Sequence, residues 1–367
     1  MDIHFSHDRY EELRKTYRKW WSGELDRPIV PIITNGHGTD LPSHTGPQFN
    51  FANAWNWDID PREFIDSCHA QLSSYRWHGD AFPHIYTAAF GPGVLAAFLG
   101  CTPVSTNRTV WFKSPDEDLP IEELHFEFDD QNRYYRRVEN LFEAAMEKWH
   151  GSVVVEMADL GGILDVLASF RGTENLLIDL LEEPDEVLRC VGELQELWFR
   201  YYDKLNAVLS PEAQGYSHWY GMYCETPGYI LQSDFSYMIS PDMFRTFAAP
   251  ELASSASRID NAVYHMDGIG EIPHLNHLLA IDSLKGIEWT PGAGEPDTRN
   301  WDELHLRILA SGKKLILYHR QDDRIGSEVA RHLGQIYLPG RTFKASDMEA
   351  AKRYGERFGV EVSETEI

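Results

Sequence analysis

The regular alternation of short apolar segments with helical patterns is the feature that most constrains the fold of this chain. Eight segments have the length and apolar content of strands, and they span 28–34, 81–88, 152–158, 229–235, 261–267, 284–290, 314–320 and 335–340. Continuous apolar runs of this kind are typical of parallel strands that are buried on both faces. Eight such strands, alternating with helices in one chain, predict an α/β protein with a (β/α)8 TIM barrel.

The segments between the strands carry signals for helix ends. Ser240 is a suitable N-cap, and Pro241 suits the first helical position that follows it. Apolar residues recur at helical spacing over 299–314 and stop near Gly312, a natural C-terminal cap. Residues 345–359 predict the last helix of the chain.

The domain organisation expected from this pattern is a single barrel domain over residues 1–367. Residues 1–27 predict an N-terminal helical extension that precedes the core, 28–367. The region 36–80 is too long for a simple connection and is rich in Gly, Pro, Trp and Asn, so we expect a loop insertion over the C-terminal mouth. Residues 210–228 predict a second loop or hairpin at the same mouth.

Charge and cysteine usage limit the partners and the compartment. The formal net charge of −25 argues against nucleic acid or an anionic membrane as a partner, because both require a basic face. No apolar run approaches the roughly 18 residues of a membrane span, and the N-terminus has no apolar signal-peptide core. The four cysteines are scattered without a CxxC pair, so a reduced, cytoplasmic protein is expected.

Polar residues stand at or near the ends of most predicted strands, where the active sites of (β/α)8 barrels lie. The candidates are His37, Glu156, Asp159, Asp234, His265, Asp267, Glu288 and His319. We expect Asp234, His265, Asp267 and Glu288 to be catalytic. We expect His37, Glu156, Asp159 and His319 to contact a small-molecule substrate.

His265 and Asp267 are the most informative pair among these candidates. Side chains at positions i and i+2 of a strand share a face, so both should point the same way where the strand ends. Such a pair suits metal ligation, or a general acid with an orienting carboxylate. The alternative is a strand-end turn with a hydrogen-bonded histidine. For Asp234 the alternative is a cap or turn acid.

The segments 229–252 and 264–292 resemble the uroporphyrinogen decarboxylase superfamily. The shared pattern is an acidic strand end at Asp234, the motif ISPxxFxxFxxP over 239–250, and a strand that ends in HxxG at 265–268. A weaker resemblance covers most of the chain. The resemblance implies a (β/α)8 barrel enzyme, and the superfamily includes both decarboxylases and methyltransferases that use corrinoid proteins. It also implies a monomer or a homodimer.

The chain departs from both branches of that superfamily at the residues that carry the chemistry. The decarboxylases resembled here have an RQAGRY motif after the first strand, whose arginines hold substrate carboxylates, whereas this chain reads IITNGHGTD. Methyltransferases of the superfamily have HxC after the fifth strand and a further cysteine near the eighth, which together hold zinc. This chain has Asp267 in place of the first cysteine, and no cysteine near the eighth strand.

These departures leave three functions open. The first is a corrinoid-linked methyltransferase activity on a small molecule, with zinc or another divalent metal held by His265, Asp267 and Cys224. A corrinoid protein would then be the methyl donor or acceptor. The second is a decarboxylase in which Asp234 and His265 steady a carbanionic intermediate. The third is a non-catalytic barrel that binds a ligand.

Overall fold

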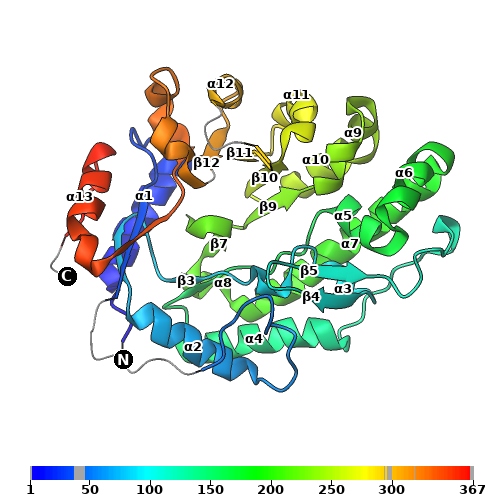
Figure 1. Cartoon of the computed structure of the whole chain (residues 1–367), viewed down its shortest axis with the longest axis horizontal. Helices are drawn as coiled ribbons and strands as arrows, with labels where there is room; N and C mark the ends of the chain where they lie inside the picture. Colours follow the sequence, from blue (N-terminus) through cyan, green and yellow to red (C-terminus); the bar gives the residue numbers. More distant parts are fainter. Residues whose placement is uncertain (1, 37–45, 293, 296–299, 318, 364–367) are drawn as a thin grey trace.

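The computed structural model describes residues 2–36, 46–292, 294, 295, 300–317 and 319–363. Helices lie on the outside of the molecule, and the strands lie toward its centre (Figure 1). The longer helices are α1 (His7–Ser22), α2 (Pro61–Ser73), α4 (Arg133–Trp149), α5 (Ile163–Arg171), α6 (Thr173–Glu182), α7 (Pro184–Leu209), α9 (Pro241–Phe247), α10 (Ala249–Ser257), α12 (Asp302–Ala310) and α13 (Met348–Arg357). Three short helices are α3 (Leu95–Phe98), α8 (Pro211–Gln214) and α11 (Leu275–Leu279).

All eight predicted strand segments contain a strand, although some are short. These are β1 (Pro31–Asn35), β3 (His84–Ile85), β6 (Val154–Val155), β9 (Gly228–Gln232), β10 (Asn261–Asp267), β11 (Gly286–Thr290), β12 (Lys314–Leu317) and β13 (Ile336–Tyr337). The other strands are β2 (Arg76–Gly79), β4 (Thr102–Ser105), β5 (Val110–Lys113), β7 (Tyr216–His218), β8 (Met222–Cys224) and β14 (Arg341–Lys344). The predicted parallel pairing holds for the five strands in the order β13-β12-β11-β10-β9.

A closed eight-stranded barrel is not shown by the ladders of the described residues. β1 pairs with β14 on one edge and with β2, in antiparallel fashion, on the other, so neither edge is left for β3. β3 pairs instead with β6 in a separate two-stranded sheet. One isolated bridge, between Ile29 and Tyr337, links the chain before β1 to the five-stranded sheet. The result is a mixed α/β fold with a largely parallel central sheet.

The structure also describes two regions that the sequence suggested were loops. Region 36–80 contains α2 and the edge strand β2, and its residues 37–45 lie outside the described part of the chain. The sequence predicted either a loop or a hairpin over residues 210–228. The structure has a hairpin there, formed by the antiparallel strands β7 and β8. No helix among the described residues has the length and apolarity needed to cross a membrane.

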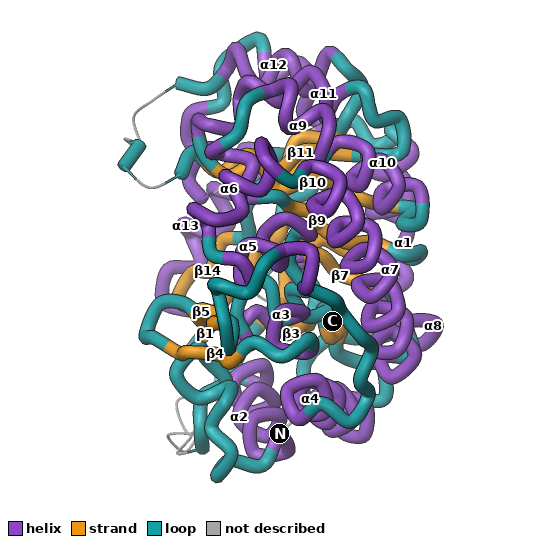
Figure 2. Tube along the Cα trace, turned by 90° about the vertical axis from the view of Figure 1, so that its right-hand side faces the viewer, coloured by secondary structure: helices purple, strands orange, loops and turns teal. Residues whose placement is uncertain are grey.

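The parallel sheet is buried because its strands are apolar on both faces. β9, β11 and β12 are buried along almost their whole length, and α10 packs against β9 and β10 (Figure 2). In β10 the burial pattern changes near the end, where His265 and Asp267 are only partly buried. Ser240 caps α9 by accepting the backbone N–H of Met243, as its sequence position predicted. The buried sheet is thus a rigid support for the side chains at its carboxyl edge.

A buried histidine in α12 should make the stability of the fold depend on acid. Burial lowers the pKa of His305 from 6.5 to about 4, and its Nε2 atom has no partner among the described residues. Between pH 6.5 and 4 the unfolded chain binds a proton at this position and the folded chain does not. The stabilisation is therefore complete above pH 6.5 and is lost as the pH falls toward 4, by about 3 kcal/mol at most. The free energy of unfolding, measured in urea, should fall between pH 7 and 4 by about 3 kcal/mol more in the wild type than in His305→Leu. Parallel pH curves would contradict this expectation.

Candidate active site

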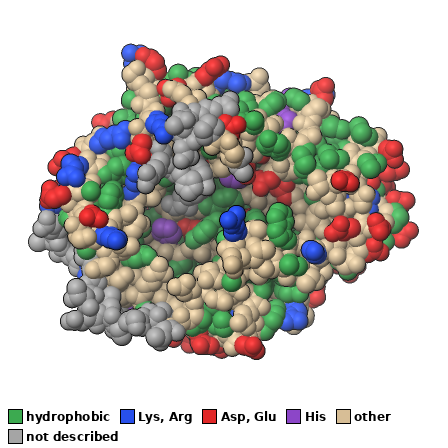
Figure 3. All heavy atoms as spheres, viewed as in Figure 1, with side chains coloured by type: hydrophobic (Ala, Val, Ile, Leu, Met, Phe, Trp, Pro, Cys, Tyr) green, Lys and Arg blue, Asp and Glu red, His purple; other side chains and the backbone are tan. Residues whose placement is uncertain are grey.

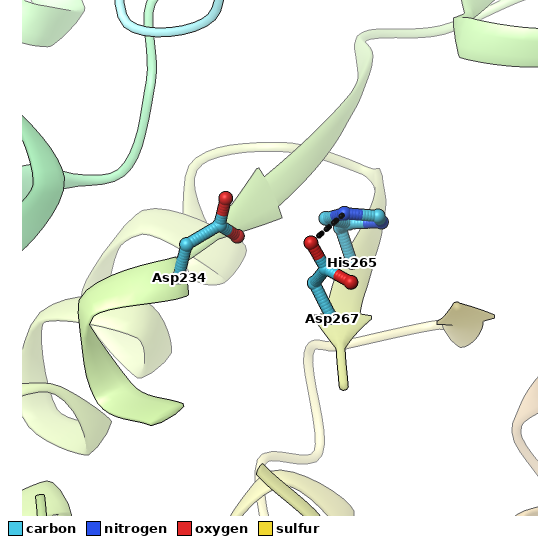
Figure 4. A group of neighbouring side chains, drawn as sticks. All are labelled: Asp234, His265 and Asp267. Carbon is cyan, nitrogen blue, oxygen red and sulfur yellow. Dashed lines mark ion pairs between the residues drawn. The ribbon is translucent and has the colours of Figure 1, made fainter. Parts of the chain in front are cut away.

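Three of the predicted catalytic side chains converge at the carboxyl ends of two neighbouring strands. Asp234 begins the 3-10 helix η4 (Asp234–Met238) directly after β9, and His265 and Asp267 end β10. One ligand atom from each side chain lies within 4.8 Å of the other two. Figure 4 shows the Asp234 carboxylate facing His265 and Asp267 across a small space. The shared face predicted for positions 265 and 267 explains how one strand supplies two of the three groups.

Glu288 supports His265 from behind rather than joining this cluster. Its buried carboxylate is hydrogen-bonded to His265 Nδ1, and Thr290 donates its hydroxyl to the other carboxylate oxygen at 2.9 Å. The pairing follows from the register, because His265 lies opposite Glu288 in the ladder of β10 and β11. The Nδ1 contact leaves Nε2 directed toward the cluster, 4.0 Å from Asp267 Oδ2. A carboxylate behind a histidine fixes the ring orientation and its tautomer.

The electrostatics of the cluster favour one positive charge at its centre. Burial alone would lower the pKa of His265, but Glu288 first, and then Asp234 and Asp267, raise it to about 10. The pKa values of Asp234 and Asp267 are raised, by burial first, although the imidazolium of His265 opposes the rise. Asp234 remains accessible to solvent, so its carboxylate can be reached by a ligand. A proton on His265 or a bound metal ion would each supply the charge.

Two further carboxyl groups surround Asp234. Asp159 is buried, and burial followed by the charge of Asp234 raises its pKa to about 7. Asp165, on α5, accepts the backbone N–H groups of Asp234 and Phe235 at 3.1 and 2.6 Å, so it holds the first turn of η4. Burial and the charge of Asp234 raise the pKa of Asp165 to about 8. These groups make the surroundings of the cluster strongly acidic.

Sequence reasoning missed Asp165 and Glu271. Glu271 is fully buried in the 3-10 helix η5 (Ile269–His274), where it accepts the Tyr264 hydroxyl at 2.7 Å and the backbone N–H of Asp267 at 3.2 Å. It therefore fixes the end of β10 from within. The signal that could have found Glu271 is its position four residues after Asp267, in a turn that follows a buried strand. Asp165 carried no local signal, because only the packing of α5 against η4 brings it to the site.

The structure does not bring the other candidates into the cluster. Cys224 was expected as a metal ligand, but its buried thiol contacts His218 Nδ1 at 3.4 Å, and His218 Nε2 contacts the carbonyl of Asn261. Asn261 begins β10 and His265 lies four residues further along, about 13 Å away at the rise of an extended strand. The expected Cys224 ligand is therefore wrong on geometry.

Of the other candidates for substrate binding, one lies apart from the cluster and two lie outside the described residues. Glu156 is buried, and its carboxylate accepts the Ser217 hydroxyl at 3.0 Å and lies 3.7 Å from His84 Nε2. The side chain of His319 and the whole of His37 lie outside the described residues. Asp159 is thus the member of this predicted group that lies near the cluster, because its carboxylate accepts the side-chain N–H of Gln232, two residues before Asp234, at 3.3 Å.

Aromatic side chains adjoin the cluster on two sides. The indole of Trp219 packs edge-on against the His265 ring, with the ring centroids 5.4 Å apart. A Cβ atom added at Gly268 or Gly270 would meet the ring of Tyr237, so these two glycines leave room for that ring just after the end of β10. Gly268 also has a positive φ of 92°, which suits glycine at the turn. On the face of the molecule that Figure 3 shows, histidine and acidic side chains lie beside hydrophobic ones near the centre of the view.

Comparison with known proteins supports the fold. No protein-family model matches the chain, and no curated protein matches its sequence. Among solved structures, a methyltransferase from Methanosarcina mazei is similar, with a TM-score of 0.59 and 13% sequence identity. The similarity covers 90% of this chain and 93% of the other. At this identity the match shows a shared fold, and the chemistry must be argued from the site.

Proposed function

We propose that this chain is a divergent member of the uroporphyrinogen decarboxylase superfamily, built on a (β/α)8-type barrel, that transfers a methyl group between a small molecule and a corrinoid protein. The observation that carries the proposal is the convergence of Asp234, His265 and Asp267 within 4.8 Å. It occurs at the carboxyl edge of a parallel sheet, in a fold similar to that of a methyltransferase. The edge where parallel strands end is where α/β folds place their ligands.

The three side chains suit a divalent metal. Metal–ligand distances of about 2.1 Å for nitrogen and oxygen place two ligands of one ion about 3 to 4 Å apart, close to the spacing found here. One imidazole and two carboxylates form a harder donor set than the cysteines of the methyltransferase branch, and they suit zinc or another divalent ion. When bound, the ion would supply a Lewis acid that polarises a heteroatom of the small molecule.

The chain's own groups would hold that site in place. Glu288 keeps the His265 ring oriented so that Nε2 faces the cluster, and Glu271 fixes the backbone of Asp267. Asp165 holds the backbone that carries Asp234. Each of these supports is buried or partly buried, so their hydrogen bonds to the cluster are shielded from water. Such support is what precise metal sites require.

The acidic surroundings disfavour the decarboxylase alternative. A porphyrinogen with several carboxylates requires basic partners, whereas Asp159, Asp165 and Asp234 make the surroundings of the cluster acidic. The methyltransferase proposal and a ligand-binding barrel both remain compatible with this charge.

Metal content and methyl transfer together test the proposal. Protein loaded with zinc or cobalt(II) should retain stoichiometric metal after gel filtration, and it should accelerate methyl transfer from a methylated small molecule to free cobalamin in the Co(I) state. Asp267→Asn should lose most of both properties because it removes a ligand charge. Asp242→Asn, a matched change at an exposed acid of α9, should retain both.

Each other result has a defined meaning. Protein that binds no divalent ion would overturn the metal site. Metal binding without methyl transfer for any methylated donor in the panel would favour the ligand-binding barrel. Release of carbon dioxide from a carboxylic substrate would favour the decarboxylase.

A further inference from the structure

A cavity of about 600 Å³ adjoins the cluster on the side of Asp234. Its walls come from β5, from α5 and the start of α6, and from η4. The volume falls in the range of pockets that bind small molecules. Asp234 belongs both to this cavity and to the cluster, so a molecule in the cavity would lie next to the proposed metal.

The charged side chains that line the cavity are mainly acidic. Asp165, Asp234 and Glu117 contribute carboxyl groups, and among the described residues Lys113 is the one basic side chain in the lining. Asp165 is already engaged by two backbone N–H groups. No N–H or O–H group of the described residues donates a hydrogen bond to the Asp234 carboxylate, which leaves it available to a ligand. An anionic ligand would meet repulsion here, and a cationic one would be attracted.

The remaining walls are aromatic and apolar. Trp111 and Phe112 line the cavity from β5, and Phe235 and Met238 line it from η4. Trp111 and Met238 are unusually exposed for such large apolar side chains, at 64% and 47%, so each offers free surface to a ligand. Aromatic faces attract cations, and a thioether adapts to irregular apolar groups. A methylated cation satisfies both parts of this lining, because its charge is spread over an apolar surface.

We propose that this cavity binds the positively charged head of a small organic cation, such as a methylated ammonium or sulfonium group, with Asp234 as its counter-ion. The assignment names the class of small-molecule substrate for the proposed function. It rests on that function only in treating the bound cation as the substrate, because the binding itself is argued from the cavity lining. A neutral molecule of the same shape lacks the attraction to Asp234 and to the aromatic faces. It should therefore bind more weakly at the same ionic strength.

The test compares choline with 3,3-dimethylbutan-1-ol, its neutral isostere, by calorimetric titration of the metal-free protein, in which the Asp234 carboxylate is not shared with a metal ion. Choline should bind about tenfold more tightly, because one desolvated cation–aromatic contact and one counter-ion together amount to that ratio. Equal affinities would overturn the proposal. So would the absence of choline binding at the highest concentration that matched sodium chloride controls allow.

Variants then locate the binding in the cavity. Asp234→Asn should weaken choline binding about threefold and leave the alcohol unaffected, and Trp111→Leu should weaken choline binding about threefold. Asp242→Asn, at an exposed acid outside the cavity, should change nothing. If choline binding persists at full strength in both Asp234→Asn and Trp111→Leu, the assignment to this cavity is wrong.

Asp267→Asn distinguishes the two proposals from each other. Asp267 belongs to the cluster and does not line the cavity, so this variant should lose metal and still bind choline. Metal binding that depends on Asp267, without choline selectivity in the wild type, would overturn the cation site alone. Choline selectivity in a protein that binds no metal would overturn the metal site alone.

Discussion

His265→Ala is expected to bind zinc or cobalt(II) about 100-fold more weakly than the wild type. Zinc sites with four protein ligands have apparent binding free energies of about 10 to 16 kcal/mol, so each ligand accounts for about 3 kcal/mol. His265 is the one nitrogen ligand of the cluster, and its Nε2 is already directed at the two carboxylates. Competition with a colorimetric chelator at fixed pH measures the affinity directly.

A graded series of variants makes this expectation specific. Glu288→Gln retains the shape of the side chain but removes the charge behind His265, and it should weaken metal binding by about 10- to 100-fold. His125→Ala is the matched control, because His125 is exposed and lies away from the cluster. His265→Ala leaves Glu288 buried with Thr290 as its remaining partner, so circular dichroism must accompany each titration. Unchanged affinity in a folded His265→Ala protein would overturn the ligand assignment.

The sequence predicted the sheet well, because apolar runs that must be buried on both faces carry a strong signal. All five strands of the parallel sheet overlap predicted segments, and the pairing of β10 with β11 places His265 opposite Glu288. The local sequence pattern does not determine whether the strands close into a barrel. Which edge of β1 pairs with which strand depends on long-range contacts, and β2 and β14 occupy both edges.

The cluster could be predicted to the extent that it is encoded locally. His265 and Asp267 share a face through the two-residue period of a strand, and Asp234 follows a buried strand directly. Asp165 and Glu271 reach the site from a helix and a 3-10 turn, so no period in the sequence marks them. The prediction of Cys224 as a metal ligand was wrong because the β7–β8 hairpin places this residue beside the start of β10. A lone cysteine in the sequence does not show which end of a neighbouring strand it will contact.

Gly162→Ala should destabilise the protein by about 3 kcal/mol and disturb the site at the same time. Gly162 is the residue before α5, and its φ of −74° is ordinary, so the cost comes from packing and not from backbone strain. An added Cβ atom would lie 2.2 Å from the carbonyl oxygen of Gln232 and 2.3 Å from Asp165 Oδ2. Overpacking of this kind costs about 1 to 3 kcal/mol or more when backbone atoms must move. Denaturant unfolding measures the loss of stability.

The displaced atoms explain why the effect should extend to metal binding. Gln232 ends β9 two residues before Asp234, and Asp165 holds the backbone of Asp234, so both contacts position the same carboxylate. Gly192 provides the matched control, since it lies inside α7 and, apart from the backbone of its own helix, no atom of the described residues lies within 4 Å of an added Cβ. Gly192→Ala should therefore stabilise the protein by up to about 1 kcal/mol and leave metal affinity unchanged. If the two alanine variants had equal stability and equal metal affinity, the close packing of α5 against the end of β9 would not support the site.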